Sequence, residues 1–255
     1  MSRLKFKIQS IQDVERADIE RMQKLFLNYY DLPNPEDFFR DFQKKDHVIV
    51  LRDKKTEDIQ GFSTQKIITH EIQGRIYQGV FSGDTLVDKE YWGDPALGFG
   101  FFCYLMKINL RHPTQKLYWH LISKGYKTYL LLTNNFDSYY PRFERETPPF
   151  EQALIDSFSQ QLYSHAYKKE LGLLQFEGPH ERLKAEVAPI TEELRKKNAK
   201  IDFFATRNPH WSRGDELVCL GEFHLLLPFN HAKKVLSRNL KRLLGIRHGK
   251  ELSSR

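Results

Sequence analysis

The stretch KGYKTYLLLTNNFDSYYPRF, residues 124–143, decides how the rest of the chain is interpreted. After a helix that ends at Gly125, the short apolar run Thr128–Thr133 is typical of a buried strand. The pair Asn134–Asn135 ends this run, and Tyr139–Tyr140 follows on a turn that Pro141 keeps short. Because ligands in open α/β sheets bind at strand ends, these amides and phenols are candidate binding groups.

Length and composition indicate a globular protein with a sizeable core. The chain has 255 residues, of which 40% are hydrophobic and 29% charged. No apolar run reaches 18 residues and the first 20 residues lack the apolar core of a signal peptide, so we expect a cytoplasmic protein without a transmembrane helix.

The cysteines and histidines predict neither disulfides nor a metal site. Cys103 and Cys219 are far apart in the sequence and neither belongs to a CxxC motif, which favours two free thiols. The ten histidines form no HxxxH or similar pair.

The net charge of +7 is a mild basic excess over the whole chain, and basic residues are densest in the C-terminal part. Residues 231–255 form a basic amphipathic tail in which leucines alternate with Lys and Arg. Such a segment suits nucleic acid, an anionic lipid surface, a phosphorylated cofactor or an acidic carrier protein, and charge alone does not choose among them. A solvated terminal segment is the default interpretation.

The first 90 residues predict two helices followed by three antiparallel strands. We expect these elements at Phe6–Ile11 (strand), Asp13–Tyr30 (helix), Pro35–Gln43 (helix), His47–Arg52 (strand), and Gly61–Ile72 with Arg75–Asp88 (hairpin). The Gln73–Gly74 pair is the expected tight turn of the hairpin.

The next part predicts a βαβ unit. A glycine-containing turn leads to an apolar helix at Gly98–Leu110, and a second helix is expected at Thr114–Tyr126. The strand at Thr128–Thr133 would then pair in parallel with Val80–Val87.

Pro148–Pro149 marks a break, after which we expect a long helix at Phe150–Leu171 and a polar helix at Glu181–Lys197. Segments Ile201–Pro209 and Glu216–Leu227 read as a closing hairpin. The predicted fold is α+β, with a mixed, mostly antiparallel sheet of about seven strands, a splayed central parallel pair and flanking helices.

This order resembles the GNAT acyltransferase family. In that family the fourth strand ends in V-x-P-x-Y-R-G-x-G-x-G, and Val87–Gly93 follows much of this pattern. The family's fifth strand is followed by an Asn, a Tyr and a Phe, which Asn134 or Asn135, Tyr140 and Phe143 resemble. The likeness covers residues 1–145 and the late hairpin, so the domain would span 1–230 with a helical insertion at about 150–199.

The resemblance implies a phosphopantetheine-bearing acyl donor. The donor site would comprise Leu86, Val87, Trp92, Gly93, Ala96, Leu97, Gly98, Asn134, Asn135 and Phe143. Trp92 replaces the family's Arg or Gln, and Pro95 falls on a glycine position and removes one amide donor. Both acyl-CoA and an acyl carrier protein remain open as donors, because the arm of a carrier protein needs less from this loop.

The resemblance also suggests catalytic groups. A phenol near the fifth strand would protonate the leaving thiolate, which points to Tyr140, with Tyr139 in reserve; packing under the sheet edge is the structural alternative. Asp84, inside an apolar strand, is the expected base for the amine, or else it bonds a neighbouring loop. His120 is the alternative base, or a packed core histidine.

The predicted function is therefore an N-acyltransferase. It would move an acyl group from acyl-CoA or an acyl carrier protein to an amine, such as an amino acid or a Lys or Orn side chain of a peptide. The apolar helix Gly98–Leu110 and the high Phe content favour a fatty acyl chain. An enzyme similar to acyl-homoserine-lactone synthases, or an inactive module that binds nucleic acid or membrane through the basic tail, is the alternative.

Overall fold

The structure is a computed structural model that describes residues 2–31, 34–177, 182–184 and 189–225. The chain divides into two units, residues 1–223 and 224–255. Only His224 and Leu225 of the second unit are described, so the predicted basic tail at 231–255 lies outside the described residues.

The N-terminal elements agree closely with the sequence-based expectation. They are β1 (Leu4–Ser10), α1 (Arg16–Leu27), β2 (Tyr30–Asp31), α2 (Glu36–Gln43), β3 (His47–Asp53), β4 (Ile59–Ile72) and β5 (Arg75–Val87). Strands β4 and β5 form the predicted hairpin, in which Gln73 and Gly74 both adopt positive φ, 51° and 74°. Two residues of positive φ match the twist of the flanking strands, which is why this short turn closes the hairpin.

The second half contains α3 (Ala96–Arg111), β6 (Leu117–Ser123), α4 (Tyr126–Asn135), β7 (Tyr139–Tyr140), α5 (Pro149–Tyr163), β8 (Tyr167–Lys168), β9 (Leu173–Leu174), β10 (Arg182–Leu183), α6 (Glu192–Lys197), α7 (Ala199–Arg207) and β11 (Glu216–Phe223). Three single turns of 3₁₀-helix lie at Ile11–Asp13, Lys89–Tyr91 and Trp211–Arg213.

In the described residues, nine strands form one mixed sheet in the order β1-β3-β4-β5-β6-β11-β9-β8, with β7 also paired to β11. Every pair is antiparallel except β5 and β6, which run parallel. A mostly antiparallel sheet with one central parallel pair and flanking helices is the predicted fold class. A separate two-stranded sheet joins β2 to β10.

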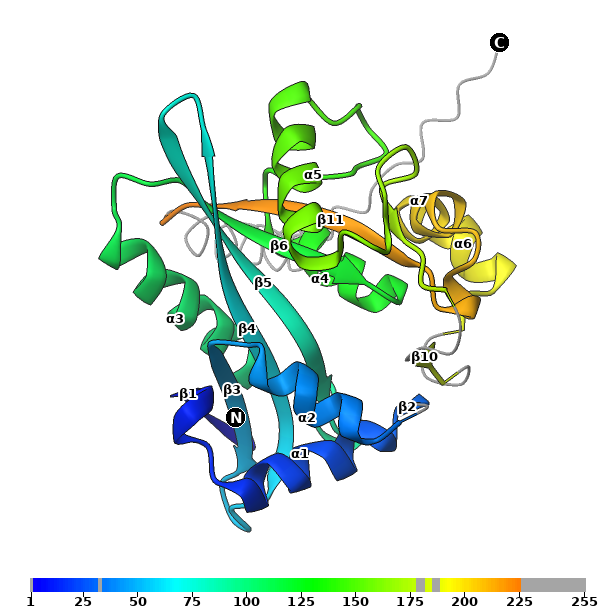
Figure 1. Cartoon of the computed structure of the whole chain (residues 1–255). Coiled ribbons are helices and arrows are strands. Elements are labelled where there is room, and N and C mark those ends of the chain that lie inside the picture. The colour runs from blue at the N-terminus through cyan, green and yellow to red at the C-terminus, as the bar shows by residue number, and fades with distance from the viewer. Residues whose placement is uncertain (1, 32–33, 178–181, 185–188, 226–255) are drawn as a thin grey trace, which may run out of the picture. The chain divides into compact units, whose positions relative to one another are not determined.

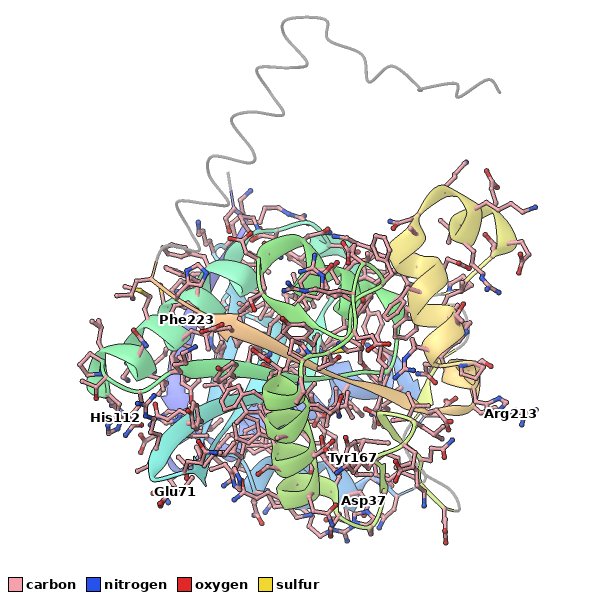
Figure 2. The ribbon with its side chains drawn as sticks, turned by 90° about the horizontal axis from the view of Figure 1, so that it is seen from above. Asp37, Glu71, His112, Tyr167, Arg213 and Phe223 are labelled. Atoms are coloured by element: carbon pink, nitrogen blue, oxygen red, sulfur yellow. The ribbon has the colours of Figure 1, made fainter. Side chains whose placement is uncertain are left out.

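Helices cover both faces of the sheet (Figure 1). On one face, α1 and α2 pack on β3 and β4 through a cluster that includes Phe26, Phe38 and Phe62, and α5 packs on β5 and β6 through Phe158. Helices α3 and α4 lie on the other face, where Trp119 of β6 contacts the rings of Phe101 on α3 and of Phe136, the residue that follows α4. Figure 2 shows β11 running across the molecule from the side of Arg213 to Phe223.

The prediction for residues 114–135 was wrong in both halves. The expected helix at Thr114–Tyr126 is strand β6, and the expected strand at Thr128–Thr133 is helix α4. A short apolar run fits a buried strand or a buried helix turn equally well, so periodicity did not separate them. In α4 the buried side chains are Tyr129, Leu132 and Thr133, which is helical spacing. The parallel partner of β5 is therefore β6.

Three later predictions also need correction. The helix expected at Phe150–Leu171 ends at Tyr163, and β8 follows it. Of the helix expected at Glu181–Lys197, the described part contains β10 and the short α6. The closing hairpin does not form, because Ile201 lies in α7; the Glu216–Phe223 segment is the strand β11, and it pairs with β6.

Candidate active site

The pairing of the parallel strands β5 and β6 ends at the centre of the sheet, and the unpaired stretch beyond Ser82 and Leu121 is called the gap. Their pairing runs from Gln78–Leu117 to Ser82–Leu121 and then stops. Strand β5 continues for five further residues, Gly83–Val87, without a partner in β6. The carboxyl ends of parallel strands are where α/β sheets bind ligands, so this gap is the first candidate site.

A β-bulge lies at the same point of β5. Gln65 of β4 is opposite Ser82, whereas Ser63 is opposite Thr85, so Thr64 faces two residues, Gly83 and Asp84. A bulge breaks the regular ladder and turns the local main chain. The main chain of β5 is therefore both bulged on its β4 side and released from β6 within the same three residues.

Helix α4 begins beside this gap, and helix α3 begins after the loop that follows β5. Helix α4 starts three residues after β6, with Gly125 as N-cap and no side-chain cap. Helix α3 follows the loop after β5, and its first amide, on Ala96, donates to Asp94 Oδ1 at 2.9 Å. A helix N-terminus carries partial positive charge, so the start of α4 favours an anionic ligand, whereas the Asp94 carboxylate already occupies the start of α3 and also accepts from the main chain of Arg3 and Leu4.

Trp92 connects the end of β5 with the start of α4. Its indole N–H donates to the Val87 carbonyl at 2.9 Å, and Lys127 Nζ lies 4.0 Å from its ring centroid. Burial lowers the pKa of the Lys127 ammonium. A cation therefore lies in the first turn of α4, beside the predicted donor loop.

The other predicted donor residues around β5 and α3 vary in exposure. Leu86 and Ala96 are buried, Val87 and Leu97 are partly buried, and Gly93 and Gly98 are exposed. Gly93 adopts a φ of +89°, which only glycine takes without strain. No side chain or distant main-chain atom lies within 4 Å of a Cβ placed on Gly93 or Gly98. The donor loop thus presents main chain to its surroundings.

A cluster of charged side chains lies on the face that α2 and α5 cover. Glu216, the first residue of β11, is 7% exposed, and its Oε1 lies 3.7 Å from Lys124 Nζ. Burial raises the pKa of Glu216; Lys124 lowers it and Asp84 raises it. The pKa of Tyr163 on α5 is raised well above its ordinary value, first by burial and then by Asp41, Glu216 and Asp84.

This cluster contains residues that the sequence prediction missed. Asp84 was predicted, but Lys124, Tyr163 and Glu216 were not, and Lys45, which bonds Asp41, was also overlooked. The signal that identified Asp84, a carboxylate within an apolar strand, is also present at Glu216 in ELVCLGEF. The order of the strands brings these residues together, although they lie far apart in the sequence, near positions 41, 84, 124, 163 and 216.

His120 lies within the core beside the gap. It is fully buried, and its ring centroid is 6.2 Å from that of Phe81 and 5.7 Å from that of Phe158. In the described part of the protein neither ring nitrogen has a hydrogen-bond partner. Burial lowers the pKa of His120 to about 3, so the imidazole is neutral at neutral pH and a weak base.

The structure places the two predicted tyrosines on β7, away from Asp84. Strand β7 pairs with β11, three strand spacings from β5, which is about 14 Å at about 4.8 Å each. The Tyr140 hydroxyl accepts a hydrogen bond from Arg145 at 2.9 Å. Burial raises the pKa of Tyr139, over whose ring Arg142 lies at 4.6 Å.

The predicted amide and aromatic donor residues near 134–143 also lie apart from the gap. Asn134 is eight residues beyond the start of α4, about 12 Å along the helix, and accepts a hydrogen bond from Lys200. Asn135 donates to the Leu131 carbonyl, and Phe143 is 46% exposed. They follow a helix rather than the fifth strand, so the spacing that suggested them no longer applies.

The described residues contain neither a metal-binding cluster nor a membrane-spanning helix. No three or more His, Cys, Asp or Glu side chains lie together in the described ranges in a way that suits a metal ion. No helix in those ranges is both long and apolar enough to cross a bilayer. Both cysteines are free thiols.

Comparison with known proteins relates the chain to solved acetyltransferase structures at low similarity. No protein-family model matches the chain, and no curated protein matches it in sequence. Escherichia coli YhbS, a GNAT family N-acetyltransferase in complex with CoA, is 13% identical with a TM-score of 0.35; the match covers 49% of this chain and 64% of YhbS, less than two thirds of that protein.

Two plant structures are similar at the same level. Arabidopsis thaliana NAA60 in complex with acetyl-CoA is 13% identical, with a TM-score of 0.40 and coverage of 55% of this chain and 94% of NAA60. Glucosamine-6-phosphate N-acetyltransferase from the same plant is 18% identical, with a TM-score of 0.34 and coverage of 45% and 80%.

Proposed function

We propose that the protein is an N-acyltransferase that moves an acyl group from a CoA thioester to an amine in the gap between β5 and β6. The observation that carries the proposal is the end of pairing at Ser82–Leu121, coincident with the bulge at Gly83–Asp84. A gap between parallel strands admits an extended pantetheine arm, and a released, bulged main chain offers amides to a thioester carbonyl.

The phosphates of the donor would lie at the N-terminus of α4. The positive end of this helix, which has no side-chain cap, and the Lys127 ammonium support this position. In this arrangement Trp92, held by Val87 and Lys127, would border the arm, and the exposed Gly93 and Gly98 would allow close approach of the phosphates.

The acceptor amine would approach from the face that α2 and α5 cover. An amine is protonated at neutral pH and must lose a proton before its lone pair attacks. Asp84 and Glu216 are the carboxylates of the charged cluster, and the raised pKa of Glu216 makes it a stronger base than an ordinary carboxylate. We assign the proton transfer to this pair, with Asp84 the nearer to the bulge.

The leaving thiolate would be stabilised at the start of α4. The sequence prediction assigned this role to Tyr140, with Tyr139 in reserve and His120 as another base. Because the fifth strand is now β6, the partly buried Tyr126, the first residue of α4, is the phenol that follows it most closely. We assign the proton that the thiolate receives to Tyr126.

The acyl chain and the acceptor are part of the proposal only as predictions from the sequence. These predictions are a fatty acyl chain, a carrier-protein donor as the alternative to CoA, and an amino acid or a Lys or Orn side chain as the acceptor. The long apolar α3 supports an apolar chain, because Phe99 on its first turn is 61% exposed and adds to the apolar surface that its ring forms with Phe6 of β1. The membrane or nucleic-acid alternatives depend on residues 231–255, outside the described part.

The test is release of free thiol from acyl-CoA thioesters of two to sixteen carbons, and from acyl carrier protein thioesters, with a panel of amines. We expect amine-dependent release with at least one pair. Asp84→Asn should lower kcat about 10²-fold, the usual effect of removing a general base. Tyr126→Phe and Tyr140→Phe form a matched pair: a loss in the first alone supports the site at α4, and a loss in the second alone returns the role to β7. No release with any pair refutes the proposal.

A further inference from the structure

A buried lysine crosses the bulge of β5. Lys45 lies two residues beyond the end of α2, and its side chain is 4% exposed. A Cβ placed on Gly83 would lie 2.6 Å from Lys45 Cε and 3.3 Å from its Nζ. The lysine side chain occupies this position only because residue 83 has no side chain of its own.

The ammonium of Lys45 is oriented by Asp41, one helical turn earlier. Its N–H groups donate to the Asp41 carbonyl oxygen at 3.1 Å and to the Asp41 carboxylate. An ammonium has three N–H donors, and among the described residues the third has no acceptor. The side chain is therefore fixed by two bonds while one donor stays available next to the main chain of Gly83.

A second donor without an acceptor reaches the same position. Thr64, which faces the bulge from β4, is fully buried, and its hydroxyl has no hydrogen-bond partner among the described residues. Its Oγ1 would lie 2.7 Å from a Cβ placed on Gly83. A buried hydroxyl without a partner is costly, and an oxygen that accepted its hydrogen bond would remove this cost.

We propose that Lys45 and Thr64 form an oxyanion site, in which they donate to the carbonyl oxygen of the thioester. This inference rests on the proposed function. The acceptor nitrogen bonds to the carbonyl carbon, and the C=O electron pair moves to the oxygen, which accepts hydrogen bonds from the Lys45 N–H and the Thr64 O–H. The carbonyl then re-forms, the C–S bond breaks and the thiolate leaves. Both donors keep their protons.

The arrangement favours this role over acylation of Lys45 itself. An ammonium has no lone pair with which to attack a carbonyl, and two of the N–H groups of Lys45 are engaged by the Asp41 carbonyl and carboxylate oxygens. An ammonium that is held by the protein and shielded from water stabilises developing negative charge strongly, because no reorganisation is needed during the reaction.

The experiment compares Lys45→Met, Lys45→Arg and Thr64→Val with Lys44→Met in the thiol-release assay. Lys44 is the matched control, since it is the adjacent lysine, its side chain is 65% exposed, and its Nζ lies 4.0 Å from the same Asp41. We expect Lys45→Met to lower kcat about 10²- to 10³-fold with little change in the KM for acyl-CoA. Lys45→Arg should keep part of the activity, Thr64→Val should lose about tenfold, and Lys44→Met should match the wild type.

Three results would overturn the inference. The first is a kcat for Lys45→Met within threefold of the wild type, and the second is a rise in KM that alone accounts for the loss. The third is intact-mass and peptide evidence that Lys45 carries the acyl group after a single turnover. If Lys45→Met does not fold, Thr64→Val decides, because an unpartnered hydroxyl is replaced by a methyl of similar size. If the wild type releases no thiol from any pair, the proposed function itself fails and the oxyanion role with it.

Discussion

The burial of His120 predicts a specific pH dependence of stability. Its pKa is lowered from 6.5 to about 3 by burial, so the unfolded state binds one more proton than the folded state between these values. The free energy of unfolding must therefore rise with pH across this window. The stability that comes from the neutral, buried His120 is fully present above pH 6.5 and is lost as the pH falls towards 3. A single group with these two pKa values destabilises the protein at pH 4.5, relative to pH 7, by about 2.5 kcal/mol.

The perturbation is His120→Phe, which keeps a ring between Phe81 and Phe158 and removes two buried nitrogens that lack partners. Urea unfolding at pH 7.0 and pH 4.5 gives the free energy of unfolding of each protein. Carboxylates contribute to the pH dependence of both proteins, so the measured quantity is the difference between their two pH differences. Between pH 7.0 and pH 4.5, the free energy of unfolding of His120→Phe should fall by about 2.5 kcal/mol less than that of the wild type.

The exposed His112 provides the control, because His112→Phe makes the same chemical change on the surface. Equal pH differences in His120→Phe and the wild type would refute the reasoning, since they would mean that the buried imidazole titrates alike in both states. Retained thiol release by His120→Phe would in addition remove His120 from the predicted bases.

Two further predictions test the packing and the donor site. A Cβ on Gly221 would lie 2.7 Å from Leu132 and 2.8 Å from Phe136, so Gly221→Ala should lower the free energy of unfolding by about 1–3 kcal/mol. Gly98 lies on a helix with open space around its Cβ position, so Gly98→Ala should raise the free energy of unfolding by up to about 1 kcal/mol. A larger loss in Gly98→Ala would contradict this account. Lys127→Ala should raise the Kd for CoA, measured by calorimetry, about fivefold, and the difference between the Kd values of the variant and the wild type should be smaller in 0.5 M salt. An unchanged Kd would mean that the phosphates do not bind beside Lys127.

Local patterns in the sequence were sufficient for the first half of the fold. The Gln73–Gly74 turn fixes the hairpin because both residues take positive φ, and the two N-terminal helices have clear periodicity and boundaries. The apolar helix after the donor loop was predicted for the same reason. In each case the deciding interactions lie within one turn or one strand of each other.

Local patterns failed where a segment's partners are distant. LYWHLIS and TYLLLT are both short, apolar and aromatic, and only the pairing of the first with β5 and β11 makes it the strand. Because of that exchange, the proposed site is at the start of α4 and not at Tyr139–Tyr140 and Asn134–Asn135.

By itself, the sequence determined the hairpin, the N-terminal helices, the apolar helix, and Asp84 as a carboxylate inside a strand, since each depends on neighbouring residues alone. Only the tertiary structure decided which strand lies parallel to β5, and that Lys45, Thr64 and Glu216 meet near the bulge. The physical reason is that strand pairing and burial are contacts between segments far apart in the chain, and no local periodicity records them.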